Sequence, residues 1–268
     1  MTWSIVTHDP ATGAFAVAVA TRAFAVGASC PFVRAGVGAV STQSMTNRYL
    51  GPAILDGLAR GLDPAHAIEG ALTGDAGSGL RQVHAVDRHG RTAAWTGRNC
   101  VEWCGSVTGA MVAGGGVAGG GVAGGEIAGG GVSVAGNMLA GEAVVAATLA
   151  EFLASGTETT TQAGPANPLP ERLIRAMLAG QDAGGDRRGR QSAAMRLITT
   201  EDFPDLDLRV DDHPDPLAEL DRLLGLWREQ AEPRLAQAPR RGNPSGFTDL
   251  DAIEAGWRIR GLDLRFRR

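Results

Sequence analysis

The chain is predicted to be an α+β protein in which an antiparallel sheet core is covered by helices. Two observations favour this class. Strand-like and helix-like segments occur in runs, with strands first, then helices, then strands again, rather than in the regular alternation of a doubly wound fold. Of the 268 residues, 44% are hydrophobic and 20% are charged, which supplies enough apolar side chains for a sizeable core.

The first segments predict a β-hairpin that begins at residue 2. Thr2–Thr7 alternates and is rich in β-prone residues, and Asp9–Gly13 is a strong turn sequence. Ala14–Thr21 is a continuous run of mostly small apolar residues, which is typical of a buried strand. A third strand is expected at Gly36–Gln43. The fold is therefore expected to start with three strands.

Apolar residues then change to helical spacing over Gly51–Leu62 and Pro64–Leu72. Gly61 and Pro64 interrupt this pattern, so two short antiparallel helices are predicted. The remaining predicted elements are strands at Gln82–Asp87 and Arg91–Thr96, further strands up to Thr108 and around Val132–Ala135, helices at Gly141–Leu153 and Pro170–Leu178, and a strand at Ser192–Ile198.

Composition divides the chain into a main domain at 1–200, an appendage at 201–235 and a basic, partly ordered tail at 236–268. Within the main domain, 113–132 repeats an Ala-Gly-Gly-Gly-Val pattern. Ordering so many glycines costs much backbone entropy, which favours a flexible surface insertion. A small regular glycine-rich stack is the alternative.

Two other segments complete the map of the chain. Gly156–Pro170 is rich in Thr, Gly and Pro and is interpreted as a loop. In the appendage, residues 206–216 predict one strand and a turn, and Leu217–Trp227 predicts an amphipathic helix. A small helical appendage is thus expected after the main domain.

Charge and cysteine content exclude several classes of protein. A net charge of −4 and a pI of about 5.8 offer no electrostatic footprint for nucleic acid. No leader sequence and no apolar run of about 18 residues is present, so neither export nor membrane insertion is expected, and a soluble, cytoplasmic protein is predicted. Three cysteines, Cys30, Cys100 and Cys104, fit a reducing compartment because an odd number leaves one unpaired.

Thr2 is the first candidate catalytic residue. Small second residues favour removal of Met1, which would leave the hydroxyl and a free α-amine on one residue. An α-amine with a pKa near 8 can accept the proton of the hydroxyl, so the two groups form a self-contained nucleophile and base. All 25 basic residues are Arg, which excludes a Lys base or a Lys Schiff base. The bland alternative is that Thr is simply common at this position.

Several motifs occur together and in order along about three quarters of the chain. They are Met1–Val6, Asp9–Gly13, Val26-Gly27, Arg34–Val40, Thr42-Gln43, Arg81–Val83, Gly136–Gly141 and Gly184–Ala194. With these motifs the chain resembles the domain of unknown function 1028 family, which is grouped with the N-terminal-nucleophile (Ntn) hydrolases. Each motif alone is weak, whereas the set is specific.

The resemblance implies a four-layer αββα sandwich of Ntn-hydrolase type with the nucleophile on the first strand. It also implies hydrolysis of a small C–N (amide) substrate or short peptide by Thr2. Ser4 lies two residues along the strand, on the same face, and is a rival nucleophile. Leu208–Leu226 is similar to a C-terminal segment that some members carry and that is labelled as peptidoglycan-binding. Because the segment is short, a helix that packs on the main domain is the alternative interpretation.

Five further residues are candidates for roles in the site. Asn137 could stabilise an oxyanion, or serve as an ordinary turn residue. Asp186 and Arg188 could orient the nucleophile or bind a substrate carboxylate, or form a structural ion pair in a loop. Arg22 resembles the Arg in the strand-two motif of Thr-type relatives, although the acidic residue expected just before it is missing. Gln43 is also expected to contact substrate.

No metal or organic cofactor is predicted, because no metal-ligand spacing and no nucleotide loop is found. His8, His89 and His213 are expected to be exposed. The expected partner is a small molecule or a short peptide, with no nucleic acid and no membrane, and a homo-oligomer is left open. A non-catalytic binding or assembly protein on the same fold, or one associated with peptidoglycan, remains the rival to an amide hydrolase.

Overall fold

The computed structural model describes residues 2–111, 117–119, 131–156, 168–258 and 261. The chain divides into two compact units, Met1–Asp221 and Arg222–Arg268. Among the described residues, no helix is long and apolar enough to cross a lipid bilayer.

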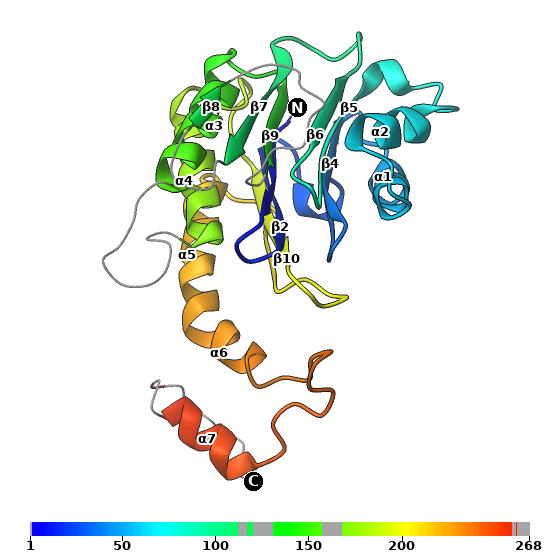
Figure 1. The fold of residues 1–268 in the computed structure, drawn as a ribbon. Coiled ribbons are helices and arrows are strands. Elements are labelled where there is room, and N and C mark those ends of the chain that lie inside the picture. The colour runs from blue at the N-terminus through cyan, green and yellow to red at the C-terminus, as the bar shows by residue number, and fades with distance from the viewer. Residues whose placement is uncertain (1, 112–116, 120–130, 157–167, 259–260, 262–268) are drawn as a thin grey trace. The chain divides into compact units, whose positions relative to one another are not determined.

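The first unit contains two antiparallel sheets (Figure 1). The larger sheet has the order β11-β10-β2-β1-β9-β7-β8 and consists of β1 (Thr2–Asp9), β2 (Ala14–Thr21), β7 (Cys104–Met111), β8 (Val117–Gly119), β9 (Gly131–Asn137), β10 (Ser192–Ile198) and β11 (Leu206–Val210). The smaller sheet has the order β3-β4-β5-β6 and consists of β3 (Pro31–Arg34), β4 (Gly38–Ser44), β5 (Arg81–Asp87) and β6 (Thr92–Thr96). The prediction of a mixed fold with antiparallel sheets is confirmed.

The two sheets face each other, and helices lie on their outer faces. Helices α1 (Leu50–Ala59) and α2 (Pro64–Leu72) pack on the four-stranded sheet, whereas α3 (Ala143–Gly156) and α4 (Leu169–Asp182) pack on the seven-stranded sheet. Strands β1, β2 and β9 contact β4 and β5 across the gap between the sheets. Figure 1 shows this order of helices, sheet, sheet and helices from one side of the unit to the other.

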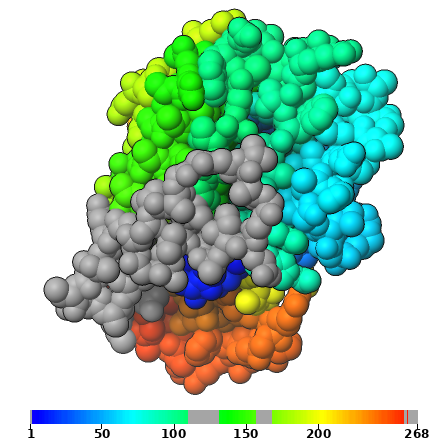
Figure 2. All heavy atoms as spheres, turned by 45° about the horizontal axis from the view of Figure 1, so that its top comes forward, coloured from blue at the N-terminus to red at the C-terminus, as the bar shows by residue number. Residues whose placement is uncertain are grey.

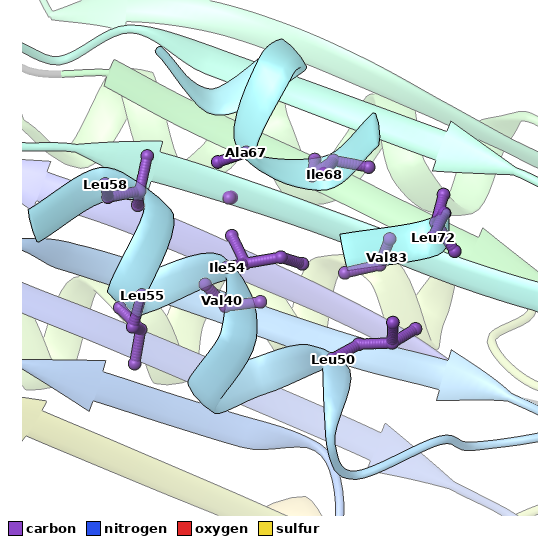
Figure 3. Close-up of a cluster of buried hydrophobic side chains, with 10 residues drawn as sticks. Val40, Leu50, Ile54, Leu55, Leu58, Ala67, Ile68, Leu72 and Val83 are labelled. Atoms are coloured by element: carbon purple, nitrogen blue, oxygen red, sulfur yellow. The ribbon is translucent and has the colours of Figure 1, made fainter. Parts of the chain in front are cut away.

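Two apolar clusters hold these layers together. One lies between the four-stranded sheet and helices α1 and α2, and Figure 3 shows its side chains, such as Ile54, Leu58 and Ile68, directed toward the strands. The other lies between the sheets, where Val6 and Phe15 pack with Val86 and neighbouring apolar residues. Burial of a Leu, Ile or Phe side chain stabilises a fold by about 1.5–3 kcal/mol, so the first cluster fixes α1 and α2 on the smaller sheet and the second fixes how the two sheets stack.

Most elements lie close to their predicted positions, and three coincide with them. β2 spans Ala14–Thr21, α2 spans Pro64–Leu72 and β10 spans Ser192–Ile198, as the sequence predicts. The strand expected at Gly36–Gln43 is wrong in detail. Gly36 has φ 66° and forms a turn, after which β4 begins at Gly38, while the preceding Pro31–Arg34 forms β3. The sequence prediction missed β3 because this strand is only four residues long and begins with Pro, which weakens the strand signal. The fold tolerates the Pro because β3 lies at the edge of its sheet.

The predicted glycine-rich insertion 113–132 lies largely outside the described residues. Of its described part, Val117–Gly119 forms β8, which pairs with β7, and Gly131 begins β9. The loop predicted at Gly156–Pro170 also falls mostly outside them, since α3 ends at Gly156 and α4 begins at Leu169. The structure thus shows that Val117–Gly119 forms an edge strand of the larger sheet and that Gly131 begins an inner strand.

The segment predicted at 201–235 contributes to the first unit, because Leu206–Val210 forms β11 and pairs with β10. α5 spans Pro216–Leu226 and matches the predicted amphipathic helix. In the second unit, a π-helical segment (Trp227–Ala231), α6 (Glu232–Leu235) and α7 (Leu250–Arg258) follow. α7 lies within the predicted tail, and its Trp257 ring stacks under the Arg234 guanidinium at 5.5 Å.

Candidate functional site

Polar side chains fill one end of the space between the two sheets. Along β1, residues 2, 4 and 6 point toward the smaller sheet; Val6 belongs to the apolar cluster, while Ser4 and Thr2 lie at the polar end. The buried polar side chains at this end are Thr2, Ser4, Thr21, Ser41, Gln43, Gln82, His84, Ser133 and Asn137. A buried polar group is costly unless it is hydrogen-bonded, so their arrangement is specific.

Ser4 is fully buried at the centre of this group. Its hydroxyl donates to Gln43 Oε1 at 2.7 Å and lies 2.7 Å from His84 Nε2. The other ring nitrogen of His84, Nδ1, lies 3.0 Å from Ser133 Oγ. One histidine therefore links a serine of β1 to a serine of β9 from the opposite sheet.

His84 is neutral in the folded protein. Burial lowers the pKa of its ring to about 3, and the interaction with Ser133 only partly opposes this effect. Because the Ser4 hydroxyl donates to Gln43, we assign the ring proton of His84 to Nε2, which then donates to Ser4, while Nδ1 accepts from the Ser133 hydroxyl. In this tautomer His84 cannot act as a base toward Ser4.

A pair of glutamines carries the network toward Asn137. Gln43 Nε2 donates to Gln82 Oε1 at 2.9 Å, and Gln82 Oε1 also accepts from Asn137 Nδ2 at 2.8 Å. Gln43 Nε2 further approaches the carbonyl oxygens of Ala135 and Thr2, at 3.1 and 3.4 Å. Asn137 Nδ2 has two protons, so one remains for another acceptor after the bond to Gln82.

Thr2 lies at the rim of the network, at the start of β1. It pairs with Asn137 in the sheet, and its hydroxyl donates to Thr21 Oγ1 at 3.2 Å. Thr2 is 5% exposed, whereas Ser4 is 0% exposed. Met138, the residue after Asn137, has φ 58°, an uncommon conformation for a residue other than Gly. Its backbone N–H donates to Val101 O at 2.8 Å. The backbone at Asn137 is therefore held from both sides.

The loop that contains Asp186 closes over the same end of the sheet. The Asp186 carboxylate is buried and accepts from the backbone N–H of Arg22 at 2.8 Å and of Arg188 at 2.9 Å. The Arg188 guanidinium forms an ion pair with the same carboxylate at 2.9 Å. Leu139 and Asp186 form an isolated β-bridge, and Arg187 N donates to Met138 O at 3.3 Å. This loop thus fixes the ends of β2 and β9 beside Thr2.

The structure brings four of the predicted site residues into one network: Thr2, Ser4, Gln43 and Asn137. Asp186 and Arg188 lie in the adjoining loop and bind each other, while Arg22 is exposed and its guanidinium donates to Gln191 Oε1 at 2.6 Å. Gln43 is fully buried, and its amide is used inside the protein.

Sequence reasoning missed His84 and Gln82. Both lie on β5, opposite Ser41 and Gln43 of β4. The missed signal was polar residues at every second position of two neighbouring strands that are otherwise apolar, which places those residues on one buried face.

The remaining histidines and cysteines do not form a metal site among the residues that the structure describes, where no three His, Cys, Asp or Glu side chains could share an ion. The expectation that His8 is exposed is wrong, because its ring stacks on Phe15 with centroids 4.6 Å apart and is 8% exposed. His89 is exposed and His213 is half-buried.

Two stacked antiparallel sheets with helices outside and a buried polar site between them define a mixed α/β protein. The chain belongs to the family of unknown function DUF1028, whose model matches residues 2–123 and 116–220. The predicted resemblance to this family is confirmed.

The chain is similar to the crystal structure of protein SPO2555 from Silicibacter pomeroyi, which bears the same family model. The two are 28% identical, with a TM-score of 0.74, over 92% of this chain and 99% of that chain. A second structure, Anbu (ancestral beta-subunit) from Yersinia bercovieri, aligns over 88% of this chain and 98% of its own, at 12% identity and a TM-score of only 0.32, which is too low to support an inference. No curated protein matches the chain.

Proposed function

We propose that this protein is an amide hydrolase of the N-terminal-nucleophile type, with Thr2 as the nucleophile after removal of Met1. The observation that carries the proposal is the position of Thr2 at the start of central strand β1, at the rim of the polar space between the sheets and paired with Asn137. The order of helices, sheet, sheet and helices supports it, because it is the layer order of the αββα Ntn hydrolases.

In the proposed reaction the Thr2 hydroxyl oxygen attacks the amide carbonyl carbon, and the α-amine of Thr2 accepts the hydroxyl proton. The second Nδ2 proton of Asn137 stabilises the oxyanion that develops on the carbonyl oxygen. The C–N bond then breaks, the leaving amine takes the proton held by the α-amine of Thr2, and an ester with Thr2 remains. The α-amine of Thr2 next removes a proton from water, and this water attacks the ester. The attack releases the carboxylic acid and restores the Thr2 hydroxyl.

Thr2 is favoured over Ser4 for two reasons. Ser4 is fully buried, so a carbonyl could not reach its oxygen without opening the sheets. Its hydroxyl proton is also directed at Gln43, and the neutral His84 ring donates to it rather than accepting from it. We assign Ser4 and His84 the role of positioning Gln43, which supports the Gln82–Asn137 bond.

The substrate-binding roles follow the same logic. Arg22 is exposed next to Thr21, so it is the arginine best placed to bind a negatively charged group of a small substrate or short peptide. Arg188 binds Asp186, and Asp186 anchors the backbone of Arg22. These two residues therefore position Arg22 and do not themselves bind substrate. Gln43 likewise acts inside the network.

A panel of amides and short peptides, assayed with variants of Thr2, tests the proposal. Intact mass must first show loss of Met1, because a retained Met1 blocks the α-amine. Thr2→Ala should abolish hydrolysis while circular dichroism and melting remain near those of the wild type, since it deletes one hydrogen bond worth about 1 kcal/mol. Thr2→Ser should keep part of the activity.

Ser4→Ala is the matched control, because it removes a hydroxyl from the same face of the same strand. It should lower activity only moderately. Full activity of Thr2→Ala together with loss in Ser4→Ala would transfer the nucleophile to Ser4. Asn137→Ala should lower the catalytic rate by about 10²–10³ with little change in substrate binding.

One observation favours a non-catalytic binding or assembly protein as the second candidate: the buried amides and hydroxyls around Ser4 satisfy one another. Such a protein would show no turnover with any amide even when Met1 is removed. A peptidoglycan-associated form of this candidate rests on the resemblance of Leu208–Leu226. Since Leu206–Val210 is a strand of the main sheet, that role would fall to residues after Val210.

A further inference from the structure

A pocket of about 450 Å³ lies between α2 and β6, on the side of the four-stranded sheet that faces away from Thr2. Trp95 of β6 pairs with Val83, which belongs to the apolar cluster under α1 and α2, so Trp95 and the pocket lie on the helix-covered face of this sheet. Figure 1 shows α2 beside β5, and Figure 2 shows this cyan part of the chain at the molecular surface. A volume of this size is in the range of sites for small molecules.

The pocket has an apolar floor and an aromatic wall. Ile68 and Leu72 of α2 contribute to the floor from the buried cluster shown in Figure 3, and Ala93 packs beside them. The wall is Trp95, which is 41% exposed, and its Nε1–H donates to Ser78 O at 3.1 Å. That bond uses the only polar atom of the ring and fixes its orientation, so the π surface remains for a ligand.

Among the residues that line the pocket, Glu69 is acidic and none is basic. Glu69 lines it, is exposed, and its carboxylate makes no hydrogen bond or ion pair with any residue that the structure describes. The C-terminal carbonyls of α2, which ends at Leu72, carry partial negative charge near the same site. Two basic side chains of neighbouring segments are paired with other carboxylates: His66 binds Asp63 at 2.6 Å, and Arg81 binds Asp75 at 2.9 Å.

We propose that this pocket binds a small organic ammonium ion that carries an apolar chain. Glu69 neutralises the charge, the Trp95 ring contacts the adjacent methylene groups and the cation, and Ile68 and Leu72 bind the chain. The chain contains no Lys, so no side chain of a second copy of this protein could supply the ammonium group. The site is independent of the proposed hydrolase site.

Indole N–H resonances of ¹⁵N-labelled protein provide the test, with Trp95 assigned from the Trp95→Phe variant. The probes are n-butylammonium chloride and n-butanol, which have the same number of heavy atoms and differ in charge, titrated at constant ionic strength. The Trp95 resonance should shift saturably with n-butylammonium, and n-butanol should bind at least about tenfold more weakly. The other Trp indoles should not move.

Glu69→Gln should raise the dissociation constant for n-butylammonium about five- to tenfold and leave that for n-butanol unchanged. Glu142→Gln is the matched control, because Glu142 is an exposed glutamate next to α3, against the other sheet, and it should change neither constant. Absence of a saturable shift, equal binding of the two probes, or an unchanged constant in Glu69→Gln would each overturn the proposal. Because no turnover is measured, failure here would leave the proposed hydrolysis untouched.

Discussion

The buried histidine between the sheets makes the stability of this protein depend on pH in a predictable way. His84 has a pKa of about 3 in the folded protein because burial disfavours the charged ring, whereas an unfolded chain titrates near 6.5. A depressed pKa means that the unfolded state binds more protons between these values. The stabilising effect is therefore complete above pH 6.5 and is lost as pH falls toward 3.

The size of the loss can be worked from the two pKa values. At pH 4.5 the unfolded ring is protonated and the folded ring is still neutral, so the free energy of unfolding falls by about 2.7 kcal/mol, from two pH units at about 1.36 kcal/mol each. The full effect, below pH 3, is roughly 5 kcal/mol. A change of this size is a large fraction of the stability of an ordinary domain.

Urea unfolding of the wild type and of His84→Gln at pH 7.0 and 4.5 measures the effect. Gln keeps one donor and one acceptor for Ser4 and Ser133 but does not titrate. The loss between the two pH values should be about 2.7 kcal/mol smaller in the variant, because carboxylates and the other histidines contribute equally to both proteins. An equal loss in the two proteins would refute the neutral, buried His84. Should the variant fail to fold, the ring resonances of wild-type His84 should remain those of a neutral imidazole down to pH 4.5.

Two further predictions concern packing and reactivity. A Cβ at Gly180 in α4 would overlap the Thr148 hydroxyl and come within 2.9 Å of Trp3 Nε1, so Gly180→Ala should lower the free energy of unfolding by about 1–3 kcal/mol in chemical denaturation. Gly70→Ala in α2, where no neighbour lies within 4 Å, should raise the free energy of unfolding by up to about 1 kcal/mol. A gain in stability at both positions would contradict the close packing at Gly180. Burial raises the pKa of Cys30 to about 11, so iodoacetamide at pH 8 should modify Cys30 only after denaturant is added. Peptide mass mapping measures this modification. Labelling of Cys30 in the native protein would count against its placement in the core.

The elements that the sequence predicts best are those whose signals are local. Pro64–Leu72 combines Pro at the first helical position with apolar residues at helical spacing, and Asp63 caps the helix by accepting from His66 N–H, so the predicted bounds coincide with α2. Ser192–Ile198 is bounded by a glycine-rich loop and coincides with β10. By contrast, β3 is stabilised by pairing with β4, and a four-residue strand has too little local pattern to be recognised.

The candidate site shows the same division. Thr2 and Asn137 could be singled out from sequence because each stands at the end of a predicted strand, but that they are register partners depends on β1 pairing with β9, more than one hundred positions along the chain. His84 is marked in the sequence only by its alternation with Gln82 along a strand of a predicted hairpin, and that pattern does not show what the ring contacts. Its roles as a buried ring and as a link between Ser4 and Ser133 arise only when the sheets stack.

The sequence by itself determined the fold class, the position of most strands and helices, the family, and the absence of any Lys that could act as a base. These properties depend on residue type, on periodicities of two and 3.6 residues and on motifs read along the chain. Only the tertiary structure decided that Ser4 is sealed inside the network while Thr2 lies at its rim, and that Arg188 is committed to Asp186. The physical reason is that burial, hydrogen-bond partners and the pKa of a group depend on what surrounds it, and here the surroundings come from strands and loops distant in sequence.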